Sequence, residues 1–359
     1  MNASVVITTK NRKEELLKAV ESAMAQRVLL EVIVIDDGST DGTVEELQKQ
    51  FSVFSFQSQE EKLATSDSRL ATAPEALSLD PQTAAKPLLR LIRHEESRGL
   101  IVRRNEGARV ARGDVFFSLD DDAVFSSPFV VEQTLRDFLH PRIGAVAIPY
   151  IEPHKANKEM QRAPTREDIW ITASYIGTAH AVRRDVFLAL GGYREHLVHQ
   201  GEEGDFCIRM LAAEKPIADG GGLKANSAEG AKALDSGPST LDAAPLSAVP
   251  GFFVRLGNSD PIIHNESPKR DYSRMDFYGR RNDVLFHWQN TPMPDLLWQL
   301  PKTIAGGLVS AAKVGRWRKM LEGIGAGFVA IAGGVRRESI SKSVIVLHKR
   351  LKRGPNRML

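Results

Sequence analysis

Three consecutive aspartates are the side chains in this sequence that most directly suggest chemistry. Asp120, Asp121 and Asp122 follow an apolar run, VFFSL at residues 115–119, that has the composition of a buried strand. Carboxylates this close together repel one another unless a cation or solvent compensates their charge. Because hard divalent cations prefer carboxylate oxygens, the cluster predicts a metal site at the end of a strand. The alternative is a solvated acidic loop, and the apolar run before it argues against that.

A second acidic pair stands at the end of another apolar run. Asp36 and Asp37 follow EVIVI at residues 31–35 and precede Gly38. Asp37 could accept a hydrogen bond from an N–H group of a bound ligand. The same segment could instead form an Asx turn and the N-cap of the next helix, so both interpretations stand on these residues alone.

A third acidic group lies in the segment GEEGD at residues 201–205. A carboxylate in such a segment could act as a general base and take a proton from a bound hydroxyl group. Acidic residues are also common at the start of a helix, where the helix dipole favours them. This structural role is compatible with the catalytic one.

These segments sit in a chain whose short strand-like runs alternate with helical patterns. The alternation is typical of a mostly parallel sheet that is covered by helices on its faces. In such a sheet the strand ends gather at one edge, which is where ligands bind. The expected strands cover residues 4–8, 31–35, 89–93, 115–119 and 143–149, and the expected helices cover 12–25, a stretch from 43, and 100–111.

Composition restricts the class of protein. Hydrophobic residues make up 42% of the 359 residues, which is enough for a sizeable core. The single cysteine, Cys207, excludes an intrachain disulfide and favours a reducing compartment. No apolar run approaches the roughly 20 residues that a spanning helix needs, and no secretory signal is evident. We therefore expect a cytoplasmic protein that is soluble or peripheral at the inner face of the cell membrane.

We expect one α/β domain over residues 1–290 and a basic helical tail over 291–359. Two stretches, at about 57–87 and 216–250, are poor in large apolar residues and are expected to be flexible insertions. Residues 295–359 contain 13 Lys and Arg against 3 Asp and Glu. Basic amphipathic helices of this kind lie on anionic membranes, although a helical cap on the domain fits equally well. Nucleic acid binding is not expected, since no reading motif accompanies the charge.

Several segments, in the same order along the chain, resemble the motifs of family 2 glycosyltransferases of the GT-A fold. They are VVITTKNRKEEL, EVIVIDDGSTDGT, SRGLIVRRNEGARVARGD, VFFSLDDDAVF and HQGEEGDFCIRML. They are similar to the family's TxxNR-like turn, DDGSTD turn, RN helix, DxD element and GEDxDLxxR motif. The resemblance covers about residues 3–288 outside the two insertions. It implies a GT-A domain, which is Rossmann-like with a mostly parallel sheet flanked by helices.

The resemblance implies binding roles for individual residues. Asp122 is the expected direct ligand of a Mn²⁺ or Mg²⁺ ion, with Asp120 and His264 as further metal residues. The expected nucleotide-sugar-binding residues are Thr8, Thr9, Arg12, Asp36, Asp37, Arg104, Asn105, Asp120, Asp121 and Arg281.

The resemblance also implies a reaction. Glu203 stands where the family has its catalytic Asp and is the expected general base, with Glu202 and Asp205 as alternatives. The implied activity is the inverting transfer of a sugar from a nucleoside-diphosphate sugar, with UDP favoured, to a hydroxyl of a glycan or lipid-linked acceptor. One alternative is a sugar nucleotidyltransferase, which would be expected to carry a Gly-rich phosphate loop that TTKNRKEEL lacks. Another is a non-catalytic nucleotide-sugar-binding subunit, which the Glu at the base position suggests.

Overall fold

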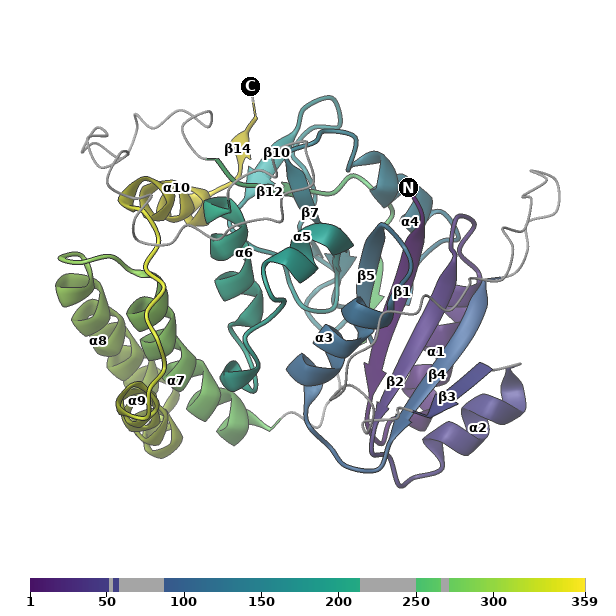
Figure 1. The fold of residues 1–359 in the computed structure, drawn as a ribbon, viewed down its shortest axis with the longest axis horizontal. Helices are drawn as coiled ribbons and strands as arrows, with labels where there is room; N and C mark the ends of the chain where they lie inside the picture. Colours follow the sequence, from purple (N-terminus) through teal and green to yellow (C-terminus); the bar gives the residue numbers. More distant parts are fainter. Residues whose placement is uncertain (52–53, 58–86, 214–249, 266–270, 359) are drawn as a thin grey trace, which may run out of the picture.

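Figure 1 shows the computed structural model of the chain, which describes residues 1–51, 54–57, 87–213, 250–265 and 271–358. The insertions expected at about 57–87 and 216–250 lie almost entirely outside the described residues. Within the part that is described, no helix is both long enough and apolar enough to cross a membrane.

The centre of the fold is a mixed sheet with ten strands in the described part of the chain. Its order is β14-β10-β12-β7-β11-β5-β1-β2-β4-β3, and the run from β5 to β3 is entirely parallel. The parallel run consists of β1 (Ala3–Thr9), β2 (Glu31–Asp37), β3 (Phe54–Gln57), β4 (Leu88–His94) and β5 (Val115–Asp120). The remaining strands are β7 (Ile143–Ala147), β10 (Trp170–Thr172), β11 (His180–Arg183), β12 (Phe253–Leu256) and β14 (Asn356–Arg357).

The parallel run brings three of the polar strand ends to one edge. In the register of the sheet, Thr8 lies opposite Asp120 and Thr9 lies opposite Asp36. Every residue of β1 and β2 is buried, as expected for parallel strands that are covered on both faces. The predicted α/β fold is therefore confirmed, and the strands predicted from apolar runs differ from the observed ones by at most two residues at each end.

Helices cover both faces of this sheet. They are α1 (Lys13–Met24), α2 (Thr43–Gln50), α3 (Leu100–Val110), α4 (Val130–Arg136), α5 (Arg184–Ala189), the 3₁₀ turn η1 (Glu195–Leu197) and α6 (Glu202–Ala212). Along β1 the side chains alternate between two cores: Val5 and Ile7 pack with α1, whereas Val6 packs with α3. Gly107 lets α3 approach this second face closely, because a Cβ there would lie 2.3 Å from a methyl group of Val6.

A second, small sheet was not predicted from the sequence because its strands are only two or three residues long. It has the order β6-β13-β8-β9, with β6 (Ala123–Phe125), β13 (Ile262–His264), β8 (Tyr150–Ile151) and β9 (Glu159–Met160). In this sheet His264 pairs with Ala123, the residue that directly follows Asp122. The small sheet therefore carries His264 to the acidic end of β5.

The C-terminal region folds into four helices in the described part of the chain, α7 (Tyr272–Asn290), α8 (Leu296–Val314), α9 (Trp317–Ala332) and α10 (Lys342–Arg353). The helices within the tail that was expected over residues 291–359 pack in two different ways. Helix α10 packs against the domain, and its residues Val344, Leu347 and Leu351 belong to the core that includes α1. Helices α8 and α9 instead pack on α7 (Figure 1).

The packing of α9 on α7 depends on glycine, and this gives a testable prediction. A Cβ at Gly323 would lie 2.2 Å from the carbonyl oxygen of Phe277, whereas a Cβ at Gly325 would meet nothing within 4 Å. We expect Gly323→Ala to lower the free energy of unfolding by about 1–3 kcal/mol, because the helices must move apart. Gly325→Ala is the matched control and should leave stability unchanged or raise it, since alanine favours a helix by about 1 kcal/mol. Equal denaturation midpoints for the two variants would contradict this packing.

Candidate functional site

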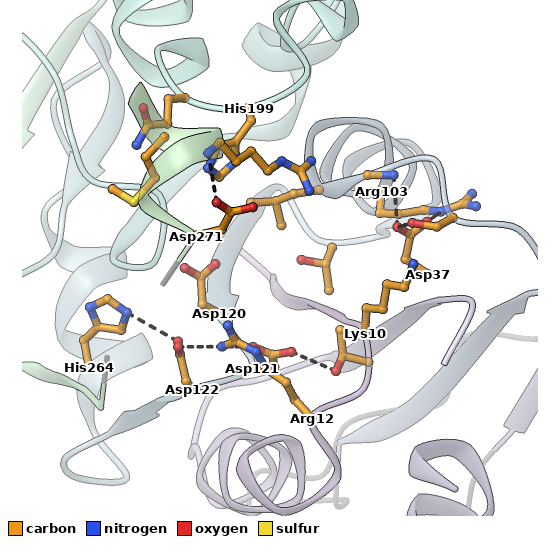
Figure 2. A pocket seen from close by; sticks show the side chains of 18 residues that line it. Lys10, Arg12, Asp37, Arg103, Asp120, Asp121, Asp122, His199, His264 and Asp271 are labelled. Carbon is orange, nitrogen blue, oxygen red and sulfur yellow. Dashed lines mark hydrogen bonds and ion pairs between the residues drawn. The ribbon is translucent and has the colours of Figure 1, made fainter. Parts of the chain in front are cut away.

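A cavity of about 530 Å³ opens at the edge where the parallel strands end. Its wall combines these strand ends with the start of α7, which closes the opposite side. The lining residues are Thr8, Thr9, Lys10, Arg12, Asp37, Ser97, Gly99, Leu100, Arg103, Asp120, Asp121, Asp122, His199, Gln200, His264, Asp271, Arg274 and Met275. The structure thus brings most of the sequence-predicted binding residues into one cavity (Figure 2).

Three of these residues form a group that could hold a metal ion. Asp120, Asp122 and His264 each offer one ligand atom, and these atoms all lie within 4.8 Å of one another. The Nε2 atom of His264 lies 3.3 Å from Asp122, and its Nδ1 atom lies 3.4 Å from Glu152 on the other side of the ring. A carboxylate behind a histidine is a common arrangement in metal sites, where it fixes the orientation of the ring. The donor set of two carboxylates and one imidazole suits Mn²⁺, and the carboxylates suit Mg²⁺.

Sequence reasoning did not identify Glu152. It follows β8 in a segment with no recognisable motif, and only the pairing of β8 with β13 brings it to His264. It is buried, and Lys155 lies 2.8 Å from it.

Arg12 compensates the charge of the neighbouring aspartates. Its guanidinium lies 2.6 Å from Asp122 and 3.1 Å from Asp121, and the Thr9 hydroxyl donates to Asp121 at 2.8 Å (Figure 2). Burial raises the pKa of Asp121 to about 7, although Arg12 and Thr9 favour its charged form. Burial also acts to raise the pKa of Asp122, but the hydrogen bond and charge of His264, with Arg12, outweigh it and lower that pKa.

Arg104 links the aspartates to the acidic start of α6. Its side chain is 4% exposed, and it contacts Asp120 at 2.6 Å, Glu202 at 3.3 Å and Glu203 at 3.5 Å. Burial alone would lower the pKa of Arg104, but the three carboxylates raise it above its ordinary value. Gly177 leaves room for this cluster, because a Cβ there would lie 2.5 Å from Glu203 and 2.8 Å from Arg104.

The three acidic residues at the start of α6 have different surroundings. Asp205 is 2% exposed and is bound by Arg194 at 2.7 Å, Arg209 at 2.9 Å and Asn290 at 2.9 Å. These contacts make it a structural link between α6 and α7. Glu202 is 3% exposed, whereas Glu203 retains 18% exposure.

Glu203 is therefore the most accessible of the three carboxylates. Burial and the neighbouring Glu202 raise its pKa, and Arg104 opposes this shift. Neither Glu202 nor Glu203 belongs to the cavity lining itself, and both are joined to it through the contact of Arg104 with Asp120.

The carboxylate of Asp37 is already fully hydrogen-bonded by the protein. One oxygen accepts from the Arg98 N–H at 2.8 Å and from Arg103 at 2.7 Å, and the other accepts from the Ser97 hydroxyl at 2.6 Å and the Gly99 N–H at 2.9 Å. Burial opposes the effect, yet these hydrogen bonds lower the pKa of Asp37. A uracil imide could therefore bind here only by replacing one of the four donors.

The neighbouring acid has a local role. Asp36 is completely buried and accepts from the backbone N–H of Ser39, three residues on, whereas an Asx turn uses the N–H two residues on. Asp41 makes that two-residue bond to the Thr43 N–H at 3.1 Å, and α2 begins after Gly42 with no side-chain cap. Asp36 does not line the cavity.

The structure does not bring Asn105 and Arg281 to the cavity. Asn105 is buried and exchanges two hydrogen bonds with the backbone of Tyr193, at 2.8 and 2.9 Å. Arg281 donates to the carbonyl oxygen of His196 at 2.9 Å and is not among the lining residues. Arg274 lies in the cavity wall instead. Sequence reasoning proposed Arg281 because the adjacent guanidinium groups of Arg280 and Arg281 could clamp phosphates. Arg274 lies two helical turns before Arg281 on the same face of α7, so only the structure shows which of the two reaches the cavity.

Comparison with known proteins relates this chain to a protein family. Residues 4–76 and 66–191 match the sequence model of the family described as glycosyl transferase family 2, so the match extends over just over half of the chain. No curated protein sequence matches the chain.

Solved structures are similar in fold. The mannosyltransferase PcManGT from Pyrobaculum calidifontis, in complex with GDP-Man and Mn²⁺, is 17% identical with a TM-score of 0.50, over 97% of this chain and 83% of that one. S. aureus TarS 1–349 in complex with UDP-GlcNAc is 13% identical with a TM-score of 0.48, over 80% of this chain and 66% of that one. GalNAc-T7 with UDP, GalNAc and Mn²⁺ is 15% identical with a TM-score of 0.47, over 79% of this chain and 51% of that one.

At 17% identity the likeness to the mannosyltransferase concerns the fold, and it agrees with the GT-A architecture implied by the sequence. The family match shows the activity as well as the fold, because it is a match of the sequence itself over residues 4–191. The chain therefore belongs to glycosyl transferase family 2 and is a glycosyltransferase.

Proposed function

We propose that this chain transfers a sugar from a nucleoside-diphosphate sugar to an acceptor hydroxyl with inversion at the anomeric carbon. The observation that carries the proposal is the convergence of Asp120, Asp122 and His264 in the cavity at the strand edge. Ligands of open α/β sheets bind at this edge, where a diphosphate would find both the metal residues and the cations of the cavity wall.

A divalent cation fits the residues that are present. Asp122 and His264 would hold it, with Asp120 beside them, and Glu152 would fix the ring of His264. Such an ion, Mn²⁺ or Mg²⁺, neutralises the charge that develops on a departing diphosphate. Arg12, Lys10 and Arg274 also line the cavity and supply positive charge for the same phosphates. Guanidinium groups suit this task because they can donate two parallel hydrogen bonds.

The reaction is an in-line displacement at the sugar. The acceptor oxygen forms a bond to the anomeric carbon while the bond from that carbon to the diphosphate oxygen breaks, and the electron pair leaves with the diphosphate. The acceptor proton passes to a carboxylate, and we propose Glu203 for this role. Glu203 is the most exposed of the three candidates, and its raised pKa makes its carboxylate a stronger base than an ordinary glutamate.

A UDP-sugar is the donor that we favour. The uracil imide N–H would take the place of one donor on Asp37, and the hydroxyl of Ser97 is the simplest to replace because it can rotate away. Both residues line the cavity. The acceptor that we propose is a hydroxyl of a glycan or a lipid-linked glycan on the cytoplasmic side of a membrane.

The metal assignment predicts the behaviour of Asp122→Asn. This variant should keep the fold but lose the Mn²⁺-dependent part of UDP binding, because it removes a charge that offsets the cation. Calorimetry with and without Mn²⁺ measures this dependence. Asp114→Asn is the matched control, since Asp114 is exposed and precedes β5 at the opposite edge of the sheet. Undiminished Mn²⁺-dependent UDP binding by Asp122→Asn would overturn the assignment.

The base assignment predicts that Glu203→Gln lowers turnover on the order of 10²-fold or more while leaving donor affinity unchanged. Release of UDP from UDP-sugars with Mn²⁺ present measures turnover, and calorimetry measures affinity. Glu202→Gln is the matched control and should retain most of the activity. If Glu202→Gln is the inactive variant, the two roles are exchanged. If the unaltered chain binds donors and never releases UDP, with water alone or with a glycan or lipid-linked acceptor added, the catalytic proposal fails in favour of a non-catalytic subunit.

A further inference from the structure

Helices α8 and α9 expose an unusual number of large apolar side chains. Trp298 is 77% exposed and Val309 is 56% exposed on α8, and Leu321 and Val329 are 48% and 72% exposed on α9. Some of their glycines face the other way: Gly323 and Gly327 of α9 pack directly on α7, and Gly307 of α8 lies against Arg280 of that helix. Each helix therefore has one face on the protein and one apolar face outward, at the end of the molecule furthest from β3 (Figure 1).

The same two helices carry a strong positive charge. Residues 296–337 contain seven Lys and Arg and one acidic residue, Glu322. That single carboxylate is already held by Arg318 at 3.0 Å and Lys319 at 2.6 Å. Lys302 and Lys313 are exposed on the same helix as Trp298. An apolar stripe bordered by basic side chains is complementary to an anionic lipid surface.

The turn between α8 and α9 is attached to the mouth of the cavity. Arg316, in this turn, pairs with Asp276 at 2.6 Å and lies over the ring of Tyr272, at the first turn of α7. Arg274 and Met275, in the same turn of α7, line the cavity. Trp317 directly follows Arg316 and is 45% exposed, and Tyr272 is 53% exposed. Aromatic residues with one polar end favour the boundary between membrane and water.

We propose that the α8–α9 hairpin docks on an anionic lipid bilayer and so holds the cavity mouth at the membrane surface. The helices would lie in the plane of the interface, with their apolar faces among the lipid head groups and acyl chains. This placement favours a lipid-linked acceptor, and that part of the inference rests on the proposed function. Helix α10, although basic, contributes its apolar face to the protein core rather than to this surface.

Flotation with lipid vesicles tests the docking, using an equal mixture of phosphatidylglycerol and phosphatidylcholine, and phosphatidylcholine alone as reference. The full chain should float with the anionic vesicles at low salt. Lys302→Gln/Lys313→Gln/Arg318→Gln should weaken partitioning on the order of 10²-fold, since each basic residue contributes about a five-fold gain. The charge control is Lys18→Gln/Lys49→Gln/Arg112→Gln, at three exposed basic residues outside the hairpin, which should partition as the unaltered chain does.

The apolar face has its own pair of variants. Trp298→Ser/Val309→Ser/Val329→Ser should lose partitioning by more than ten-fold. Leu139→Ser, at an apolar residue that is 79% exposed after α4, should not change it. The chain has four tryptophans, and Trp298 and Trp317 are exposed in the hairpin, so vesicles should also shift the tryptophan emission to the blue. Trp298→Phe/Trp317→Phe should abolish that shift.

Three results would overturn the docking. One is equal flotation of the charge and apolar variants and their controls. The second is flotation that does not depend on anionic lipid. The third is a dimer without lipid that the apolar variant dissociates, with no vesicle binding, because the face would then cover a second copy of the chain. Donor binding by the same variants, from thermal shifts with UDP and Mn²⁺, separates this test from the proposed function. Hairpin-dependent flotation without donor binding would sustain the docking and refute the function.

Discussion

The site depends on how two arginines compensate the carboxylates that the fold gathers at one sheet edge. Arg12 contacts Asp121 and Asp122, and the buried Arg104 contacts Asp120 and the acidic start of α6. An uncompensated charge in such surroundings is costly, and removing one partner of a buried ion pair typically costs about 3–5 kcal/mol. The arginines hold the acidic segments together. An excess of negative charge remains at Asp120 and Asp122, and a divalent cation would neutralise it.

Much of this arrangement follows from local sequence, because long apolar runs followed by acidic turns specify both the strands and their polar ends. The structure adds the register of β1 and β5, which places Thr8 beside Asp120. Glu152 escaped prediction because strands of two or three residues leave no periodic signal. The sequence also did not show that the Asp37 carboxylate is fully hydrogen-bonded by the protein. That depends on Arg103, whose side chain points inward from a helix of low amphipathicity. The Gln57–Pro87 and Pro216–Pro250 insertions lie almost wholly outside the described residues.

The C-terminal region shows why charge alone does not assign a role to a helix. Helix α10 ends in a basic cluster, yet its apolar side chains Val344 and Leu351 complete the domain core, and β14 after it extends the sheet. Helices α8 and α9 have similar charge and the opposite distribution of apolar surface. Glycines of these helices pack against α7, and the large apolar side chains on the opposite faces remain exposed. The start of α7 is shared between the cavity wall and the hairpin turn, which couples the position of the cavity to the proposed membrane surface.

We propose that the cavity at the sheet edge binds a nucleoside diphosphate through a metal ion held by Asp122 and His264. The most direct measurement is anomalous X-ray scattering from crystals grown with Mn²⁺ and UDP. We expect an anomalous peak within coordination distance of Asp122 and His264, next to Asp120, at a position that also contacts the diphosphate. A diphosphate bound in the cavity with no anomalous peak at these residues, or a peak at other residues alone, would contradict it.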